Sequence, residues 1–304
     1  MTECERIIKK GVLPTDFLNP EVKCDFLVDE KRKKLWAVSL DLLLELDRVC
    51  KKHNLKYFLM GGTLIGAIRH DGFIPWDDDI DVAMLREDYE KLLEIGPAEF
   101  NEPYFFQTPE TDENYYFSFA KLRNSNTSGI SYAFRYEKFN QGIFLDIFPL
   151  DNCLLGDLED RFDKINKLVA DNSTYMRMSN PNPSESDKER IATHSGRNPM
   201  DVYNEIQEIA MQYKDIETEY ISTAVLTAYK YDTLLYKKSW FDEIIYKDFE
   251  GLRFPIPKMY DEALRVQYGD YMQLPPKEQR GNWHSQTVFE PDVPYKEFIK
   301  TLQN

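Results

Sequence analysis

Apolar residues recur at helical spacing within residues 29–55. The repeating positions are Leu35, Val38, Leu42, Leu46 and Val49. Three- and four-residue spacing among charged neighbours predicts an amphipathic helix. We expect its single apolar face to pack on a sheet.

Shorter apolar runs follow this helix and predict strands. The run at 57–60 ends at the pair Gly61-Gly62, and residues 64–69 follow as a helical turn, so the order is strand, tight turn, helix. Alternating acidic and aliphatic residues predict a second strand over 79–84, with a helix over 86–94. Further strands are expected over 116–123 and 142–148, the latter ending at Pro149 because proline cannot donate to a ladder. We expect these strands to form a mixed sheet.

The second half of the chain has a mainly helical pattern from 157 to 225, interrupted at Asn180-Pro181-Asn182-Pro183. Hairpin strands are expected over 234–240 and 244–254, and a helix over 259–268. We therefore expect an α+β fold, in which a helical insert interrupts a sheet core. The units are an extension over 1–26, the core over 27–155, a helical subdomain over 156–232 and a hairpin with a helix over 233–304 that return to the core.

The composition and charge of the chain exclude several classes of protein. Of 304 residues 42% are hydrophobic, enough for a substantial core. The formal charge is -15, from 53 acidic and 38 basic side chains, which disfavours nucleic acid as a partner. No run is apolar enough to span a bilayer and the first residues do not resemble a signal peptide. We expect a soluble, cytoplasmic protein, compatible with peripheral membrane contact. The four cysteines lack CxxC spacing, so no zinc site is predicted.

The acidic run Asp77-Asp78-Asp79-Ile80-Asp81 is the first candidate for chemistry. In an extended strand Asp77, Asp79 and Asp81 would share one face, and Asp78 would face the other way. Converging carboxylates repel one another unless a cation neutralises them, and hard oxygen ligands favour Mg²⁺ or Mn²⁺. The alternative is a solvated acidic turn. An EF-hand fits poorly, since Val82 would stand where glycine is required.

The second candidate is Gly61-Gly62-Thr63, between a strand and a helix. Glycine permits close backbone approach, and a helix N-terminus offers free N–H groups to a phosphate. Taken alone, a glycine pair is more often just a turn. Together with the acidic strand, this turn predicts one pocket for phosphate and metal.

These motifs extend into a longer pattern that resembles the LicD family of phosphotransferases. The segments that carry the resemblance are Gly61-Gly62-Thr63-Leu64-Ile65-Gly66-Ala67-Ile68-Arg69-His70, Gly72-Phe73-Ile74-Pro75-Trp76-Asp77-Asp78-Asp79-Ile80-Asp81, Lys121-Leu122-Arg123 with Asn126-Thr127, Gly142-Ile143-Phe144-Leu145-Asp146-Ile147-Phe148-Pro149-Leu150-Asp151, and Tyr268-Gly269-Asp270-Tyr271-Met272 with Leu274-Pro275-Pro276. The likeness covers about 31–284 and is weakest in the helical region.

The resemblance implies a nucleotidyltransferase-like fold. It further implies transfer of phosphocholine, or a similar phospho-alcohol, from a CDP-linked donor such as CDP-choline to a sugar hydroxyl of a bacterial glycan, which would be a teichoic acid, lipopolysaccharide or capsule precursor, free or lipid-linked. Fukutin-related proteins, which use CDP-ribitol, are similar. By this likeness Asp79 and Asp81 match the acidic pair and Asp146 is the third carboxylate. All three are then expected to be catalytic and to bind Mg²⁺ or Mn²⁺, with Asp146 also the preferred general base.

The remaining expected contacts are with the donor. The phosphates should lie at Gly61, Gly62 and Thr63 and be held by cationic groups, for which the candidates are Arg69, His70, Lys121 and Arg123, with His284 a weaker one. A choline headgroup favours aromatic walls, and Trp76, Trp240 and Trp283 are candidates, each of which could instead be a core aromatic.

Two other functions fit parts of the pattern. A glycosyltransferase with an Asp-x-Asp metal motif would use a nucleotide-sugar, and it predicts consecutive parallel β-α units ahead of the motif. A non-catalytic, metal-dependent choline- or glycan-binding module would bind ligand without turnover.

Overall fold

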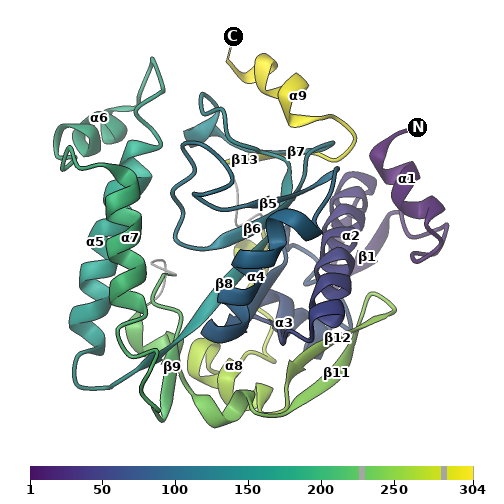
Figure 1. The fold of residues 1–304 in the computed structure, drawn as a ribbon. Helices are drawn as coiled ribbons and strands as arrows, with labels where there is room; N and C mark the ends of the chain where they lie inside the picture. The colour runs from purple at the N-terminus through teal and green to yellow at the C-terminus, as the bar shows by residue number, and fades with distance from the viewer. Residues whose placement is uncertain (226–229, 282–285, 304) are drawn as a thin grey trace.

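The computed structural model describes residues 1–225, 230–281 and 286–303 (Figure 1). The α-helices are α1 (Glu3–Lys9), α2 (Glu30–His53), α3 (Gly61–Arg69), α4 (Arg86–Glu99), α5 (Leu158–Tyr175), α6 (Glu185–Ala192), α7 (Pro199–Ala210), α8 (Tyr260–Tyr268) and α9 (Tyr295–Leu302). The strands are β1 (Glu21–Lys23), β2 (Phe26–Val28), β3 (Phe58–Leu59), β4 (Asp81–Leu85), β5 (Tyr104–Gln107), β6 (Ala120–Asn124), β7 (Ser128–Ser131), β8 (Ile143–Cys153), β9 (Tyr220–Ser222), β10 (Leu235–Lys237), β11 (Ile244–Phe249), β12 (Leu252–Pro257) and β13 (Thr287–Glu290). Short 3-10 helices are η1 (Tyr132–Phe134), η2 (Tyr231–Leu234), η3 (Lys238–Phe241) and η4 (Lys277–Gln279).

The long strand β8 organises the central sheet. One edge of β8 pairs in parallel with β4, which pairs antiparallel with β3. The other edge pairs antiparallel with β6 over the first half of β8 and with β9 near its end. β5 extends the sheet beyond β6, and β10 extends it beyond β9. The expected mixed sheet and α+β fold are confirmed, and the helix expected over 29–55 is α2.

The prediction that a strand ends at Pro149 is wrong, since β8 continues to Cys153. The amide of Asp146 donates to the Ile80 carbonyl at 3.0 Å, on the β4 side. Backbone direction alternates along a strand, so Pro149 points to the opposite edge. There β6 pairs only as far as Ile147 and β9 begins at Asp151, so no ladder donor is needed at the proline.

The two faces of the sheet are covered by different helices. Leu145 and Ile147 of β8 join the apolar core beneath α2 and α4. Phe148 and Leu150 join a second core with α5, α7 and α8 (Figure 1). By the period of two, Asp146 lies on the second face. The candidate site is therefore opposite α2 and α4.

The later segments also return to this sheet. α5 and α7 lie side by side, and the chain then adds β9 to the edge of β8 (Figure 1). The expected hairpin of 234–240 with 244–254 is wrong. β10 pairs with β9, and the second expected strand turns back at Glu250-Gly251, so that its two parts, β11 and β12, form the hairpin. The segment 238–241 coils into η3 and so ends β10 early. At the other terminus, α1 packs on α2, where Arg6 and Lys10 pair with the buried Asp41.

Candidate active site

The glycine turn brings α3 against two acidic residues. Gly61 has φ of +57°, and a β-carbon there would lie 3.4 Å from Oδ2 of Asp81 and 3.3 Å from the hydroxyl of Tyr268. A β-carbon on Gly62 would lie only 2.7 Å from Oδ2 of Asp77. Glycine is required at both positions, for conformation at the first and for space at the second. The N-terminus of α3 therefore meets the acidic run directly.

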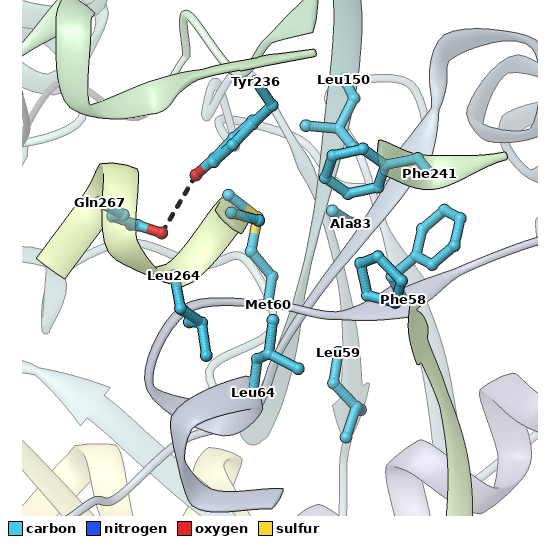
Figure 2. Close-up of a pocket in the computed structure, with 13 residues that line it drawn as sticks. Phe58, Leu59, Met60, Leu64, Ala83, Leu150, Tyr236, Phe241, Leu264 and Gln267 are labelled. Carbon is cyan, nitrogen blue, oxygen red and sulfur yellow. Dashed lines mark hydrogen bonds between the residues drawn. The ribbon is translucent and has the colours of Figure 1, made fainter. Parts of the chain in front are cut away.

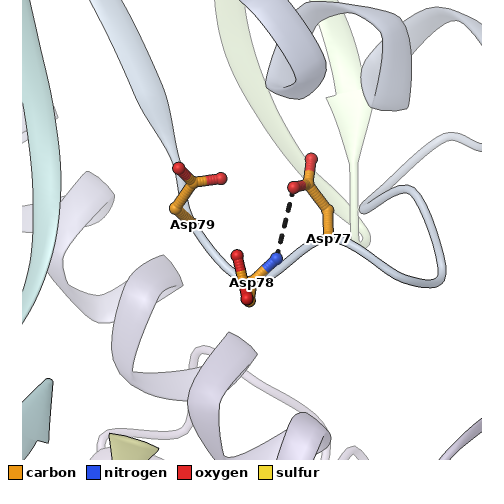
Figure 3. A group of neighbouring side chains, drawn as sticks. All are labelled: Asp77, Asp78 and Asp79. Carbon is orange, nitrogen blue, oxygen red and sulfur yellow. Dashed lines mark hydrogen bonds between the residues drawn. The ribbon is translucent and has the colours of Figure 1, made fainter. Parts of the chain in front are cut away.

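The acidic run itself is a loop rather than a strand. β4 begins only at Asp81, and one carboxylate oxygen from each of Asp77, Asp78 and Asp79 lies within 4.8 Å of the others (Figure 3). The expected alternation, with Asp78 facing away, is wrong. Because Asp77 and Asp78 lie in irregular backbone ahead of β4, the period of two does not apply to them.

Helix α2 holds this loop by the carbonyl of Asp77. Nη1 of Arg32 donates to that oxygen at 2.7 Å, and Nε1 of Trp36 donates at 3.0 Å. The Trp36 ring stacks on Phe73, with centroids 4.6 Å apart, which fixes the indole. Arg32 and Trp36 are one helical turn apart, so both reach the same oxygen. Neither residue stands out in the sequence, because both resemble other members of an amphipathic helix.

The three clustered carboxylates repel one another. Burial, and then the charges of Asp79 and Asp78, raise the pKa of Asp77 well above its ordinary value. A divalent cation would offset this cost, and a set of carboxylate oxygens is the donor chemistry that Mg²⁺ and Mn²⁺ prefer. The residues present therefore fit the expected metal.

A second charged group lies on neighbouring strands. Asp81 of β4 is the register partner of Asp146 on β8, and Asp146 is the partner of Lys121 on β6. Nζ of Lys121 lies 2.5 Å from Oδ1 of Asp146. Burial lowers the pKa of Lys121, and the negative charge of Asp146 offsets part of this effect. Within the described residues, the oxygens of Asp79, Asp81 and Asp146 do not form a three-residue group with the 4.8 Å spacing found at 77–79. Their joint ligation stays a prediction.

The other expected phosphate-binding cations are engaged elsewhere. Arg69 donates through Nη1 to the carbonyl of Tyr271 at 2.5 Å and through Nε to Nε2 of His70 at 2.9 Å. Burial, and then Arg69, lower the pKa of His70 to about 4, so this imidazole is neutral at pH 7. Arg123 is buried and donates to Gln107 and to the carbonyl of Gly142. These arrangements favour structural roles, and of the four cations only Lys121 contacts an acidic site residue.

Thr63 and the tryptophans also have structural partners. The hydroxyl of Thr63 accepts the amide of Asp81 at 2.9 Å and so ties α3 to β4. Trp76 is buried beside Phe26 and His70, at the base of the acidic loop. Trp240 packs at the edge of the second core. Trp283 and His284 lie outside the described residues.

Tyr268 is a site residue that the sequence did not assign, although it stands in one of the motifs. A β-carbon on Gly61 would lie 3.3 Å from the hydroxyl of Tyr268 and 3.4 Å from Oδ2 of Asp81, so Tyr268 and Asp81 both adjoin the glycine turn. A small apolar pocket adjoins the same turn, and Tyr236 donates there to Oε1 of Gln267 at 3.0 Å (Figure 2). Its volume of about 20 Å³ fits a water molecule and not a nucleobase, so no ligand is assigned to it.

A mixed sheet with a glycine turn, a short helix and carboxylates on adjacent strands defines a nucleotidyltransferase-like protein. The family model described as LicD/FKTN/FKRP, nucleotidyltransferase domain, matches residues 54–185. The chain is 30% identical over 254 residues to the lipopolysaccharide cholinephosphotransferase LicD of Haemophilus influenzae, a match that covers 83% of this chain and 95% of that protein. It is 39% identical over 51 residues to the ribitol 5-phosphate transferase FKRP of Homo sapiens, 17% of this chain and 10% of that one. The chain belongs to the LicD family and is a transferase of the LicD type.

Across the described residues, the structure contains no helix that is long and apolar enough to cross a bilayer.

Proposed function

We propose that this enzyme transfers phosphocholine, or a closely similar phospho-alcohol, from a CDP-linked donor to a sugar hydroxyl of a bacterial cell-surface glycan, in the cytoplasm and with Mg²⁺ or Mn²⁺. The observation that carries the proposal is the match along 95% of the Haemophilus influenzae cholinephosphotransferase. The ribitol 5-phosphate relative supports the wider class of phospho-alcohol donors. The acceptor is a teichoic acid, lipopolysaccharide or capsule precursor.

The carboxylates would hold the metal. We assign Asp79, Asp81 and Asp146 as its ligands, with Asp77 and Asp78 completing the acidic wall around Asp79. When bound, the ion would neutralise charge that develops on the donor's phosphates. Without an ion, burial and the charges of Asp79 and Asp78 raise the pKa of Asp77.

The glycine turn would hold the phosphates. The first amides of α3 have no intrahelical partners, and the missing side chains of Gly61 and Gly62 leave the backbone open to approach. Lys121 supplies a positive charge from β6 on the same face of the sheet. The donor would therefore lie between the N-terminus of α3 and the β4–β8 pair.

Asp146 is the proposed general base. The acceptor oxygen attacks the phosphorus of the phosphocholine group, the bond from that phosphorus to the CMP oxygen breaks, and CMP leaves with the electron pair. The proton of the acceptor hydroxyl passes to a carboxylate oxygen of Asp146. The ammonium of Lys121 lies 2.5 Å from that carboxylate and holds it in place on β8.

A donor panel tests the reaction. CMP release would be measured with CDP-choline, CDP-ribitol and CDP-glycerol, Mg²⁺ and purified glycan acceptors. CDP-choline is expected to support the fastest release. If another CDP-alcohol reacts and CDP-choline does not, the choline assignment fails while the transferase class stands; if none reacts, the proposal fails.

The glycosyltransferase alternative is disfavoured by the topology. A nucleotide-sugar enzyme with an Asp-x-Asp motif would place parallel β-α units before that motif. The strand before the acidic loop, β3, pairs antiparallel with β4, and β1 and β2 form a separate hairpin. Turnover distinguishes the enzyme from a non-catalytic binding module. Such a module would bind the donor, but neither the native protein nor an Asp79→Asn variant would release CMP.

A further inference from the structure

Aromatic rings surround the ammonium of Lys121, beside the proposed general base. Nζ of Lys121 lies 3.9 Å from the ring centroid of Phe144, 5.2 Å from that of Phe119 and 5.6 Å from that of Phe117. We call these three phenylalanines the aromatic wall. It lies on the face of the sheet that carries Asp146.

The aromatic wall already contacts one cation, the ammonium of Lys121. Ring faces attract a positive charge within about 6 Å, and the attraction strengthens where water is excluded. Lys121 is only 7% exposed, whereas Phe117 and Phe119 are partly open to solvent. Phe119 is supported from behind by Phe148, with centroids 4.5 Å apart. Part of the surface of Phe117 and of Phe119 is therefore open to a ligand.

We propose that the aromatic wall binds the quaternary ammonium of the donor's phosphocholine group. This inference rests on the proposed function and names the part of the site that selects choline. A quaternary ammonium cannot donate a hydrogen bond, so ring faces and a nearby carboxylate are the groups that recognise it. Phe117, Phe119 and Asp146 supply both within one small region.

The charges of the site match those of phosphocholine. Lys121 and Asp146 form a buried pair of opposite charges. Phosphocholine is also a pair of opposite charges, a phosphate joined to an ammonium by two carbons. The phosphate is attracted to Lys121, and the choline ammonium is attracted to Asp146 and to the rings. The same arrangement offers a neutral ribitol or glycerol group no comparable attraction.

The test compares two donors of equal phosphate charge by calorimetry with Mg²⁺ present: CDP-choline and CDP-glycerol. Native protein is expected to bind CDP-choline more tightly. Phe119→Leu removes one ring and should reduce this preference by about three- to tenfold, with little change for CDP-glycerol. Phe119→Tyr keeps a ring and should retain the preference. Phe117→Leu should behave like Phe119→Leu, which guards against a folding defect in one variant.

The possible outcomes distinguish a failure of choline recognition by the aromatic wall from a failure of the proposed transferase function. If native protein shows no preference for CDP-choline, or if Phe119→Leu and Phe117→Leu both keep it, the wall serves only as a platform for Lys121 and the inference is overturned, although CMP release from CDP-choline continues. If folded native protein binds neither donor and releases no CMP, the proposed function fails and the inference fails with it.

Discussion

At the scale of single residues, Gly62 is the most constrained position in the glycine turn. A β-carbon there would lie 2.7 Å from Oδ2 of Asp77, so Gly62→Ala must displace the Asp77 carboxylate from its place in the acidic loop. We expect kcat/KM for CMP release to fall by about a hundredfold, since small displacements at a reacting centre are costly. Gly156→Ala is the matched control, because a β-carbon at Gly156 meets nothing within 4 Å. Equal activity in both variants would contradict the close contact.

The acidic loop predicts a pH dependence of stability. Folding raises the pKa of Asp77, so the folded state binds more protons than the unfolded state between the two pKa values. The stability linked to Asp77 is therefore fully present below its unfolded pKa and is lost as pH rises through its folded pKa. Thermal unfolding in EDTA should show this loss, and Asp77→Asn should flatten it and stabilise the protein at pH 7.

Mg²⁺ provides the control for that series. Added Mg²⁺ is expected to stabilise native protein most at the higher pH values, where Asp77 is charged, and to stabilise Asp77→Asn less. Identical pH profiles for the two proteins in EDTA would show that burial and the neighbouring charges do not raise the pKa of Asp77.

At the scale of elements, α2 positions the site by its hold on the Asp77 carbonyl. Trp36→Phe removes the Nε1 donor, 3.0 Å from that oxygen, and keeps a ring against Phe73. We expect a loss of about 1 kcal/mol in the free energy of unfolding. The Mg²⁺ concentration for half-maximal activity should rise severalfold, because the loop is less well held. Trp240→Phe, in the second core, should leave that concentration unchanged; the account is wrong on this point if both variants shift it equally.

A second contact between elements shows that a family motif residue can be structural. Asp151 lies in the motif around Asp146, yet its two oxygens accept hydrogen bonds from Arg86 of α4 at 2.6 and 2.9 Å, and both residues are buried. Asp151→Ala leaves a buried guanidinium uncompensated, so we expect a loss of about 3–5 kcal/mol in denaturant unfolding. Replacement of the exposed Glu90, which also contacts Arg86, should cost less than about 1 kcal/mol. Similar costs would argue against the buried pair.

Elements with a clear period could be predicted, and those set by distant pairing could not. The spacing in 29–55 predicted α2, because one apolar face must be buried. Pro149 misled the prediction of β8, since the gap between β6 and β9 that accommodates it depends on strands far away in sequence. The acidic run was expected to be an extended strand, but an irregular loop ahead of β4 gathers Asp77, Asp78 and Asp79 instead.

At the scale of the whole molecule, the motifs predicted the fold family and the approximate place of the site. Residues far apart in sequence, Gly61, Asp81, Lys121, Asp146 and Tyr268, do lie near the same face of the sheet. The roles of Arg69, His70 and Arg123 could not be predicted. The sequence does not distinguish a cationic side chain that binds a phosphate from one that donates to a backbone carbonyl. The spacing of Phe117, Phe119 and Lys121 in the strand expected over 116–123 places them on one face, but only the pairing of β6 with β8 brings Phe144 to Lys121.

The central claim is a metal-dependent transfer in which Asp146 takes the acceptor's proton. The most direct measurement is the rate of CMP release from CDP-choline in the presence of acceptor, compared for native protein with Mg²⁺, native protein with EDTA, and Asp146→Asn with Mg²⁺. We predict fast release only in the first case, no release in EDTA, and release slower by about a thousandfold or more for Asp146→Asn. Full activity in EDTA, or a variant as fast as native protein, would contradict the account.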